Sequence, residues 1–215
     1  MNLTVAELWR YPVKGLGGEP LESVEIAPDG IPGDRSLRVL DERGLVTGRR
    51  KQRMIGLPAT LGGDGEARIA GHPWTSPQAS AAIREVAGAA ATLSRPLGGH
   101  EFDSHPILLL SDGSVSQLSY DRRRFRPNIY VSGADGPVEQ DWIGRDVKVG
   151  GVRLRVDEPC ERCVITTIDP DTIEVDLAVL ERARSELDGI MGVYCSVLEA
   201  GRVARGDRVD IAVGM

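Results

Sequence analysis

The alternation of hydrophobic and polar residues predicts a chain built mainly from short strands. Val152, Leu154 and Val156 alternate with charged residues, which is typical of a strand with one buried face. The wholly apolar run at 107–110 predicts a strand that is buried on both faces. Short β-branched runs between Gly and Pro residues predict about ten strands in all, at 3–9, 23–27, 34–39, 45–47, 107–110, 129–131, 147–149, 152–157, 192–198 and 209–213.

Three segments have helical patterns instead. The clearest covers 77–91, where an alanine-rich apolar stripe repeats on one side. Residues 176–187 place leucines at the spacing of one inward helix face. Ser111 is a natural N-cap for a short helix that ends at Leu118, and the free N–H groups of such a helix start favour anions.

Many strands and few helices together indicate the fold class. They favour a mainly β (α+β) fold, a closed or partly closed β-barrel with two or three peripheral helices, over a parallel α/β sheet. The segment 93–102 contains Pro96, Gly98 and Gly99 and is the best boundary along the chain. We therefore expect two parts, at 1–95 and 96–215, with the functional site between them.

Composition narrows the classes of protein and of partner. The chain has 215 residues and a net charge of −6, which disfavours a nucleic-acid binder. No apolar run approaches the ~18 residues of a membrane-spanning helix, and the N-terminus lacks the pattern of a signal peptide. Three cysteines suggest a reducing compartment rather than a disulfide framework. We expect a cytoplasmic monomer that binds neither membrane nor nucleic acid.

The candidate chemistry centres on the stretch at 157–170, DEPCERCVITTIDP. Cys160 and Cys163 stand in C-x-x-C spacing, and the β-branched run after them predicts that Cys163 enters a strand. That placement argues against a thioredoxin-type pair at a helix start. A structural zinc site needs about four ligands, which the isolated Cys195 and three unspaced histidines do not complete. Two half-buried structural cysteines, or a thiolate that holds another group, remain as interpretations.

Several basic and hydroxyl residues predict an anion site. The glycine-rich loop at 11–18 presents Lys14, and Arg35, Ser111 and Arg126 follow later in the chain. Together with the thiols they indicate an anion-plus-thiolate site. No catalytic triad, G-x-G-x-x-G motif or Walker A loop is present, so triad hydrolases and nucleotide folds are disfavoured.

Six motifs in a fixed order resemble the MOSC family, named for the C-terminal domain of molybdenum cofactor sulfurase, and most of all its amidoxime-reducing branch. They cover nearly the whole chain: YPVK at 11–14, GDR at 33–35, TGR at 47–49, FRPNI at 125–129, CERC at 160–163 and TTIDP at 166–170, followed by a closing Gly206-Asp207. The resemblance implies an N-terminal β-barrel-like half followed by the MOSC domain.

The resemblance also implies a cofactor and its contacts. The cofactor is molybdopterin with molybdenum, and its one protein ligand is the thiolate of Cys163, the second of the pair. A soft thiolate suits a metal that a dithiolene already holds. The family often has Ser after the YPVK lysine, whereas Gly15 here offers a backbone N–H instead. The implied cofactor contacts are Lys14, Gly15, Arg35, Ser111, Ser114, Arg126, Asn128 and Tyr194.

Two functions follow from the resemblance, and a third from the cysteines. In the first, molybdenum accepts the oxygen of an N-hydroxylated substrate, a hydroxylamine or amidoxime. Because no ferredoxin-like domain is appended, electrons would come from a separate ferredoxin, flavin reductase or cytochrome b5-like protein. In the second, the protein is a non-catalytic cofactor-handling or sulfur-carrier module that uses Cys163 as a persulfide or cofactor thiol. A thiol-based redox sensor would instead need Cys160 and Cys163 to pair reversibly.

Overall fold

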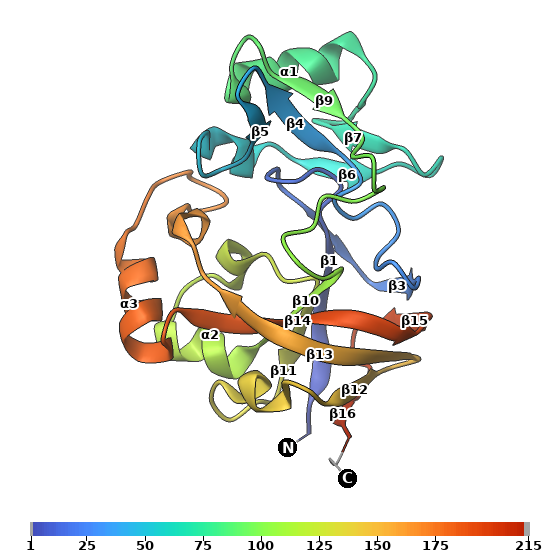
Figure 1. The fold of residues 1–215 in the computed structure, drawn as a ribbon, viewed down its shortest axis with the longest axis vertical. Coiled ribbons are helices and arrows are strands. Elements are labelled where there is room, and N and C mark those ends of the chain that lie inside the picture. Colours follow the sequence, from blue (N-terminus) through green and yellow to red (C-terminus); the bar gives the residue numbers. More distant parts are fainter. Residues whose placement is uncertain (1, 213–215) are drawn as a thin grey trace.

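The largest element of the computed structural model, which describes residues 2–212, is a curled sheet of eight strands. Its spatial order is β16-β12-β13-β14-β10-β11-β1-β2, and Figure 1 shows it in the lower part of the molecule. The bounds are β1 (Thr4–Arg10), β2 (Glu19–Leu21), β10 (Ile107–Ser111), β11 (Ile129–Ser132), β12 (Asp146–Val149), β13 (Val152–Glu161), β14 (Ile190–Glu199) and β16 (Val209–Ile211). The predicted mainly β fold is confirmed.

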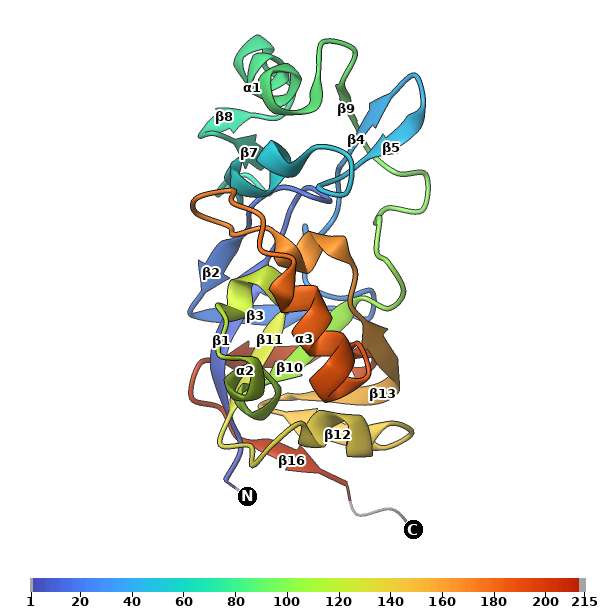
Figure 2. The same ribbon diagram turned by 90° about the vertical axis from the view of Figure 1, so that its left-hand side faces the viewer.

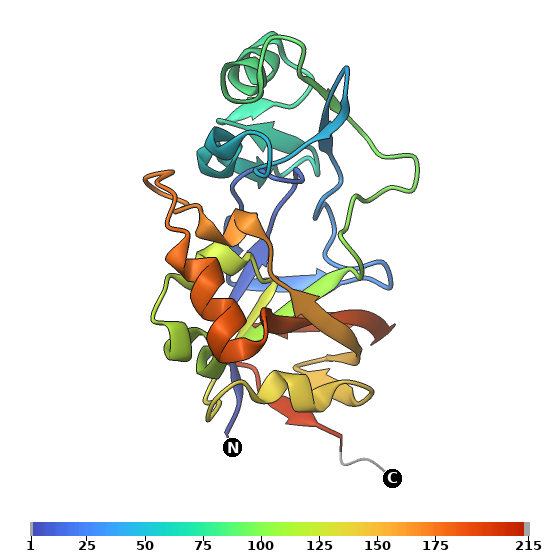
Figure 3. The ribbon, with the colours of Figure 1, turned by 60° about the vertical axis from the view of Figure 1, so that its left-hand side comes forward.

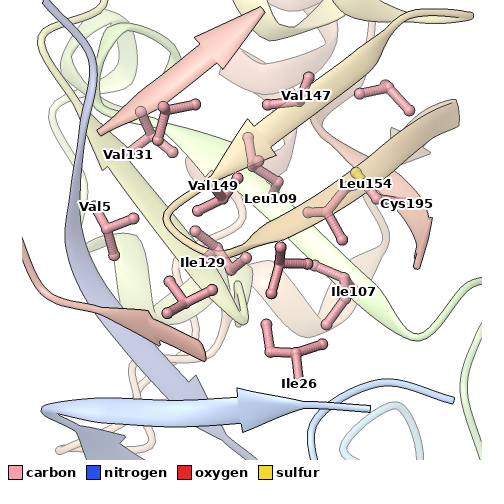
Figure 4. Close-up of a cluster of buried hydrophobic side chains, with 14 of the residues drawn as sticks. Val5, Ile26, Ile107, Leu109, Ile129, Val131, Val147, Val149, Leu154 and Cys195 are labelled. Atoms are coloured by element: carbon pink, nitrogen blue, oxygen red, sulfur yellow. The ribbon is translucent and has the colours of Figure 1, made fainter. Parts of the chain in front are cut away.

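The core of this sheet explains its strand pattern. All five residues of β10 are buried, as the apolar run at 107–110 predicts. The inward residues of β13 are buried and alternate with partly exposed ones. Figure 4 shows Ile107 and Leu109 of β10 and Leu154 of β13 among the side chains of the neighbouring strands, with Cys195 in the same cluster. Cys195 is therefore a small core residue, and burial raises the pKa of its thiol.

Strands β10 and β11 run parallel, so the chain must cross over between them. The crossover contains α2 (Asp112–Leu118) and the 3₁₀ helix η2 (Arg122–Phe125). Figure 2 shows α2 beside α3 (Ala178–Leu187), and both helices contribute to a separate hydrophobic cluster that packs beside the sheet. A further 3₁₀ helix, η3 (Val138–Trp142), precedes β12.

A second group of small elements, the small-sheet region, has its own hydrophobic core. Figures 1 and 3 show it at the opposite end of the molecule from β16. Its two three-stranded sheets have the orders β5-β4-β9 and β6-β7-β8. Its elements are β4 (Arg38–Asp41), β5 (Gly44–Val46), η1 (Gln52–Gly56), β6 (Ala59–Leu61), β7 (Ala67–Ile69), β8 (His72–Pro73), α1 (Pro77–Ala87) and β9 (Thr92–Ser94).

The first strands of the chain pair with its second part. Strand β1 lies beside β11 and β2 in the large sheet, and β3 (Ser23–Ile26) pairs with β15 (Gly201–Ala204). The expected division into 1–95 and 96–215 stays a prediction. Among residues 2–212, no helix combines the length and hydrophobicity that crossing a membrane requires.

Two predicted strands are wrong at the residues that matter most. Strand β13 ends at Glu161, and Cys163 precedes the 3₁₀ helix η4 (Val164–Thr167) instead of entering a strand. The β-branched run turns because the Thr166 hydroxyl donates to the Cys163 carbonyl at 2.9 Å and the Thr167 hydroxyl donates to the Val164 carbonyl at 2.7 Å.

Arg35 also lies outside a strand. It has a φ of 47°, its backbone N–H donates to the Tyr11 carbonyl at 2.7 Å, and β4 begins only at Arg38. Other predicted elements are found with shifted ends. The helix predicted at 77–91 ends at Ala87 because Gly88 adopts a φ of 112°. The strand predicted at 209–213 ends at Ile211, and residue 213 lies outside the described residues.

Candidate functional site

A cavity of about 360 Å³ lies between the small-sheet region and the large sheet. Its lining combines residues between Leu45 and Arg50, in and after β5, with residues between Cys160 and Thr166, at and after the end of β13. Lys14 and Cys163, from distant parts of the chain, both line it. We call this cavity the first pocket. It brings together seven of the nine residues that the resemblance implies: Lys14, Gly15, Arg35, Arg126, Asn128, Cys163 and Tyr194.

The first pocket is strongly basic although the whole chain is acidic. Its lining includes seven cationic side chains and two carboxylates, Asp103 and Glu161. The cations are Lys14, Arg35, Arg49, Arg50, Arg124, Arg126 and Arg162. A concave surface with this excess of one sign concentrates ligands of the opposite sign. The lining therefore favours an anionic ligand.

A buried carboxylate organises one wall of the pocket. Asp34 is fully buried and accepts hydrogen bonds from the Tyr11 backbone N–H at 2.6 Å, the Asn128 amide at 3.1 Å and the Arg35 guanidinium. Burial by itself would lower the pKa of Arg35, but Asp34 more than offsets this, so the pKa is raised. Arg35 is thus a fixed cation at the pocket wall.

Asn128 holds this wall in place with both ends of its amide. Nδ2 donates to Asp34 and to the Trp9 carbonyl at 3.3 Å. Oδ1 accepts from the Leu108 backbone N–H at 3.1 Å and from Arg35 at 3.2 Å. For the cofactor contact that the resemblance implies, Asn128 therefore has no free amide group. Its visible role is to position Arg35.

The ring of Tyr11 contacts two guanidinium groups. Arg35 lies 4.7 Å and Arg126 4.3 Å from the ring centroid, within the range of cation–π contacts. Unlike Arg35, Arg126 has no carboxylate or hydrogen-bond acceptor for its side chain among the described residues. Burial, with the nearby charge of Arg35, lowers its pKa to about 10. Arg126 is thus a partly buried cation without a counter-ion among the described residues.

Lys14 is held by the segment that joins the two regions. Its Nζ donates to the Phe102 carbonyl at 3.2 Å and forms an ion pair with Asp103 at 2.9 Å. Burial raises the pKa of Asp103, but the hydrogen bond and charge of Lys14 more than offset this and leave the pKa lowered. Asp103 is thus already paired with the ammonium group that an anionic ligand would contact.

Gly15, next to Lys14, has a φ of 83°, and an added Cβ would lie 3.2 Å from the Thr47 Cα. The bend therefore requires glycine. The backbone of the loop approaches Thr47 closely at this point.

Two thiols face the first pocket. Cys160 is buried at the end of β13, whereas Cys163 is partly exposed. Burial, followed by the neighbouring Cys160 thiol, raises the pKa of the Tyr194 phenol. No group of three or more His, Cys, Asp and Glu residues within 2–212 has the arrangement of a metal site. Cys163 could contribute only one ligand to a metal that another group also holds.

Arg162 lies between the two thiols in the chain. Its Nη1 donates to the Phe125 carbonyl at 3.0 Å, and its guanidinium lies 5.5 Å from the Phe125 ring. Its Nε and Nη2 are buried and have no partner in the described part of the chain. Buried donors without partners are rare in native structures, so the environment of Arg162 is short of acceptors.

Ser111 and Ser114 do not line the first pocket. Both hydroxyls donate to the carboxylate of Glu139, from Ser114 at 2.6 Å, and the backbone N–H of Ser114 donates to the Ser111 hydroxyl at 3.3 Å. All three residues are fully buried. Ser111 caps α2 as predicted, but an internal carboxylate already takes the place of the anion.

Several residues of the site were not singled out in the sequence. Asp34 stands inside the GDR motif, where only Arg35 had an assigned role. Tyr11 likewise belongs to the YPVK motif, where only Lys14 did. Asp103 had no local signal, because it follows a turn-rich connection and meets Lys14 only in the folded chain.

Comparisons with known proteins identify the family. The family model for the MOSC N-terminal beta barrel domain matches residues 2–89, and the model for the MOSC domain matches residues 98–210. Human mitochondrial amidoxime-reducing component 1 is 28% identical over 228 residues, covering 79% of this chain and 67% of its own. Human mitochondrial amidoxime reducing component 2 is 27% identical over 278 residues, covering 96% and 82%.

A solved structure supports the fold alone. The YUAD protein from Bacillus subtilis covers 100% of this chain and 98% of its own, with a TM-score of 0.56 and 17% identity. On the two family models, which together span nearly the whole chain, this protein belongs to the MOSC domain family, and its curated relatives include mitochondrial amidoxime reducing components.

Proposed function

We propose that this protein is a reductase of N-hydroxylated compounds that binds molybdopterin with molybdenum in the first pocket. One observation carries the proposal. A partly exposed thiol, Cys163, shares a cavity with Lys14, Arg35 and Arg126, although these residues come from distant parts of the chain. The curated relatives named for amidoxime reduction indicate the class of reaction.

The residues present fit this cofactor. A cavity of about 360 Å³ lies within the ~300–1,000 Å³ range of small-molecule sites. The ligand must be anionic to offset Arg126, which has no counter-ion among the described residues, and Arg162, whose donors are unsatisfied. Since no cluster of metal-ligating side chains is found within 2–212, a metal here must bring most of its own ligands. A thiolate is the soft donor that suits molybdenum held by a dithiolene.

The chain's own residues bind and orient the cofactor. Lys14, Arg35 and Arg126 neutralise the anionic groups, with arginine able to form bidentate bonds. Asp34 and Asn128 fix the direction of Arg35, and the N–H of Gly15 adds a backbone donor. Cys163 provides the single protein ligand, and Tyr194 with Cys160 forms the neighbouring wall. When bound, the cofactor supplies the two-electron chemistry that removes oxygen from a hydroxylamine or amidoxime.

Electrons for this reaction would come from a separate protein. The chain has no dinucleotide motif, and the proposal assigns nicotinamide oxidation to a ferredoxin, flavin reductase or cytochrome b5-like partner. The purified protein should therefore reduce hydroxylamines with an artificial reductant but not with a nicotinamide cofactor as sole donor. A non-catalytic carrier would bind the cofactor and show no turnover under either condition.

The experiment compares Cys163→Ser with Cys160→Ser. A serine hydroxyl stays protonated near neutral pH and is a poor ligand for molybdenum, so Cys163→Ser should lose almost all activity while retaining some cofactor. Cys160→Ser should keep most of both. The measurements are molybdenum content and turnover of an N-hydroxylated substrate. Equal loss of activity in both variants would favour a working dithiol pair over the proposed reductase.

A further inference from the structure

A second cavity, of about 220 Å³, adjoins the first pocket. Trp9 and Tyr11 line this second pocket and not the first, whereas Arg126 lines both. Ile55 and Gly56 at the end of the 3₁₀ helix η1, together with Pro58, Pro170 and Asp171, also contribute to its wall. The proposed function uses none of this space. The two cavities are therefore separate binding volumes that share one guanidinium group.

The walls of the second pocket combine aromatic rings and prolines with a few charged groups. The rings of Trp9 and Tyr11 stack with their centroids 6.3 Å apart and an interplanar angle of 18°. Three prolines contribute to the lining. An added Cβ at Gly18 would lie 2.4 Å from the Tyr11 ring and 2.7 Å from the Arg10 carbonyl, so a side chain at Gly18 would displace the ring. Such walls favour a planar, unsaturated ligand.

Only one charged group in the second pocket is available to a ligand. Arg123 is already paired with Asp121 and with Asp171, both at 2.6 Å. Arg126 has no such partner among the described residues, and its backbone adopts a φ of 55°, which a non-glycine residue rarely takes. One unpaired guanidinium beside aromatic walls selects a single carboxylate on a flat ring.

We propose that the second pocket binds a small aromatic carboxylate, with its ring against the partly exposed Trp9 and its carboxylate on Arg126. The volume suits one ring. Because an anion in the first pocket would use the same guanidinium, the two ligands weaken each other's binding, and this coupling is reciprocal. The proposal does not depend on the identity of the ligand in the first pocket.

The test uses benzoate for the second pocket and inorganic pyrophosphate for the first, both by isothermal titration with the purified chain. A ligand of benzoate's size should bind with a dissociation constant on the order of 1 mM. Neutral benzamide should bind about tenfold more weakly, because it cannot form the charged bond to Arg126. Pyrophosphate at saturation should weaken benzoate binding about fivefold, and benzoate should weaken pyrophosphate binding by the same factor.

Matched variants separate the two pockets. Trp9→Ala should weaken benzoate binding about tenfold, whereas Trp9→Phe, which keeps a flat ring, should change it less than about threefold. Trp74→Ala is the control, since the indole N–H groups of Trp9 and Trp74 each donate to a glutamate at 2.7 Å but Trp74 lines neither pocket. Lys14→Ala should weaken pyrophosphate binding and leave benzoate binding unchanged, because Lys14 lines only the first pocket.

Four results would overturn the proposal. One is no heat of binding for benzoate up to about 20 mM with the unmodified chain. Another is equal affinity for benzoate and benzamide, which would mean that Arg126 is not engaged. The third is loss of benzoate binding in Trp74→Ala as large as in Trp9→Ala. The fourth is loss in Lys14→Ala, which would place benzoate in the first pocket.

Discussion

The first pocket and the Ser111–Glu139 network are both places where the sequence predicts anion binding. In the network, two buried serines face an internal carboxylate, and every hydroxyl has a partner. In the first pocket, Arg126 has no counter-ion among the described residues, and Lys14 is paired with an exposed aspartate from a connecting segment. Hydrogen-bond donors for an anion are present in both places, but only the pocket has capacity left for a ligand.

The difference shows what a motif cannot reveal. Whether a hydroxyl or a cation is available depends on the acceptors that the rest of the fold brings to it. Glu139 reaches Ser111 and Ser114 from a segment more than twenty residues later in the chain, with separations of 28 and 25 residues. Buried polar groups need partners, so a fully satisfied cluster is structural and an unsatisfied one is a candidate site.

The largest expected effect is the difference in pyrophosphate affinity between the variants Lys14→Ala and Ser114→Ala. Lys14→Ala should weaken pyrophosphate binding about 30-fold, because a charged hydrogen bond in a partly desolvated pocket is lost. Ser114→Ala should leave the affinity unchanged, since Ser114 bonds only within the network. Titration calorimetry on both variants measures this. Equal losses of affinity in the two variants would mean that Ser114 also contacts the ligand, and the contrast between the two regions would not hold.

The second prediction concerns the network itself. Glu139→Gln should lower the free energy of unfolding by about 2 kcal/mol, because the charged acceptor of three donors is replaced by a neutral amide. Denaturant titration gives this value, and Glu42→Gln in the exposed β4–β5 turn is the control. Pyrophosphate affinity should not change. Unchanged stability would mean that the network is not a structural unit.

A smaller effect is expected at Asp103. Asp103→Asn removes the internal competitor for Lys14, so pyrophosphate should bind about fivefold more tightly. Asp29→Asn is the control, because this exposed aspartate contacts His100 on the same connecting segment but does not line the pocket. Weaker binding in Asp103→Asn would instead make Asp103 part of the ligand site.

The smallest effect is the pH dependence of the Lys14–Asp103 pair. The pKa of Asp103 is lowered in the folded chain, so the pair stabilises the fold above the unfolded carboxyl pKa of about 4. This contribution is lost as the pH falls through the lower, folded-state value. Thermal unfolding of the unmodified chain and Asp103→Asn should therefore differ slightly at pH 7 and converge near pH 3. A difference that grows in acid would contradict the pair's assignment.

Much of the fold could be predicted from local patterns. Period-2 alternation identified β13, and a wholly apolar run identified β10, because both patterns follow directly from which faces are buried. The turn after Cys163 could not be predicted this way. β-Branched residues favour strands on average, but two threonine hydroxyls here close a 3₁₀ turn on the preceding carbonyls.

A residue of the site could be predicted where its residue type alone indicates its chemistry. Lys14 and Arg126 have charges that must find a partner or a ligand, so their residue types already indicated an anion. Asn128 could not be predicted in this way, because its amide forms hydrogen bonds with Arg35, Asp34 and backbone groups that lie far away in the chain. Such competition for a polar group exists only in three dimensions.

The most direct test of the central claim is the molybdenum and pterin content of the purified chain, produced in a host that makes the cofactor. The account predicts stoichiometric molybdenum with a released pterin in the unmodified protein and in Ser114→Ala, and a clear deficit of both in Lys14→Ala. Absence of molybdenum and pterin from the unmodified protein, while another molybdenum enzyme from the same cells is fully loaded, would contradict it.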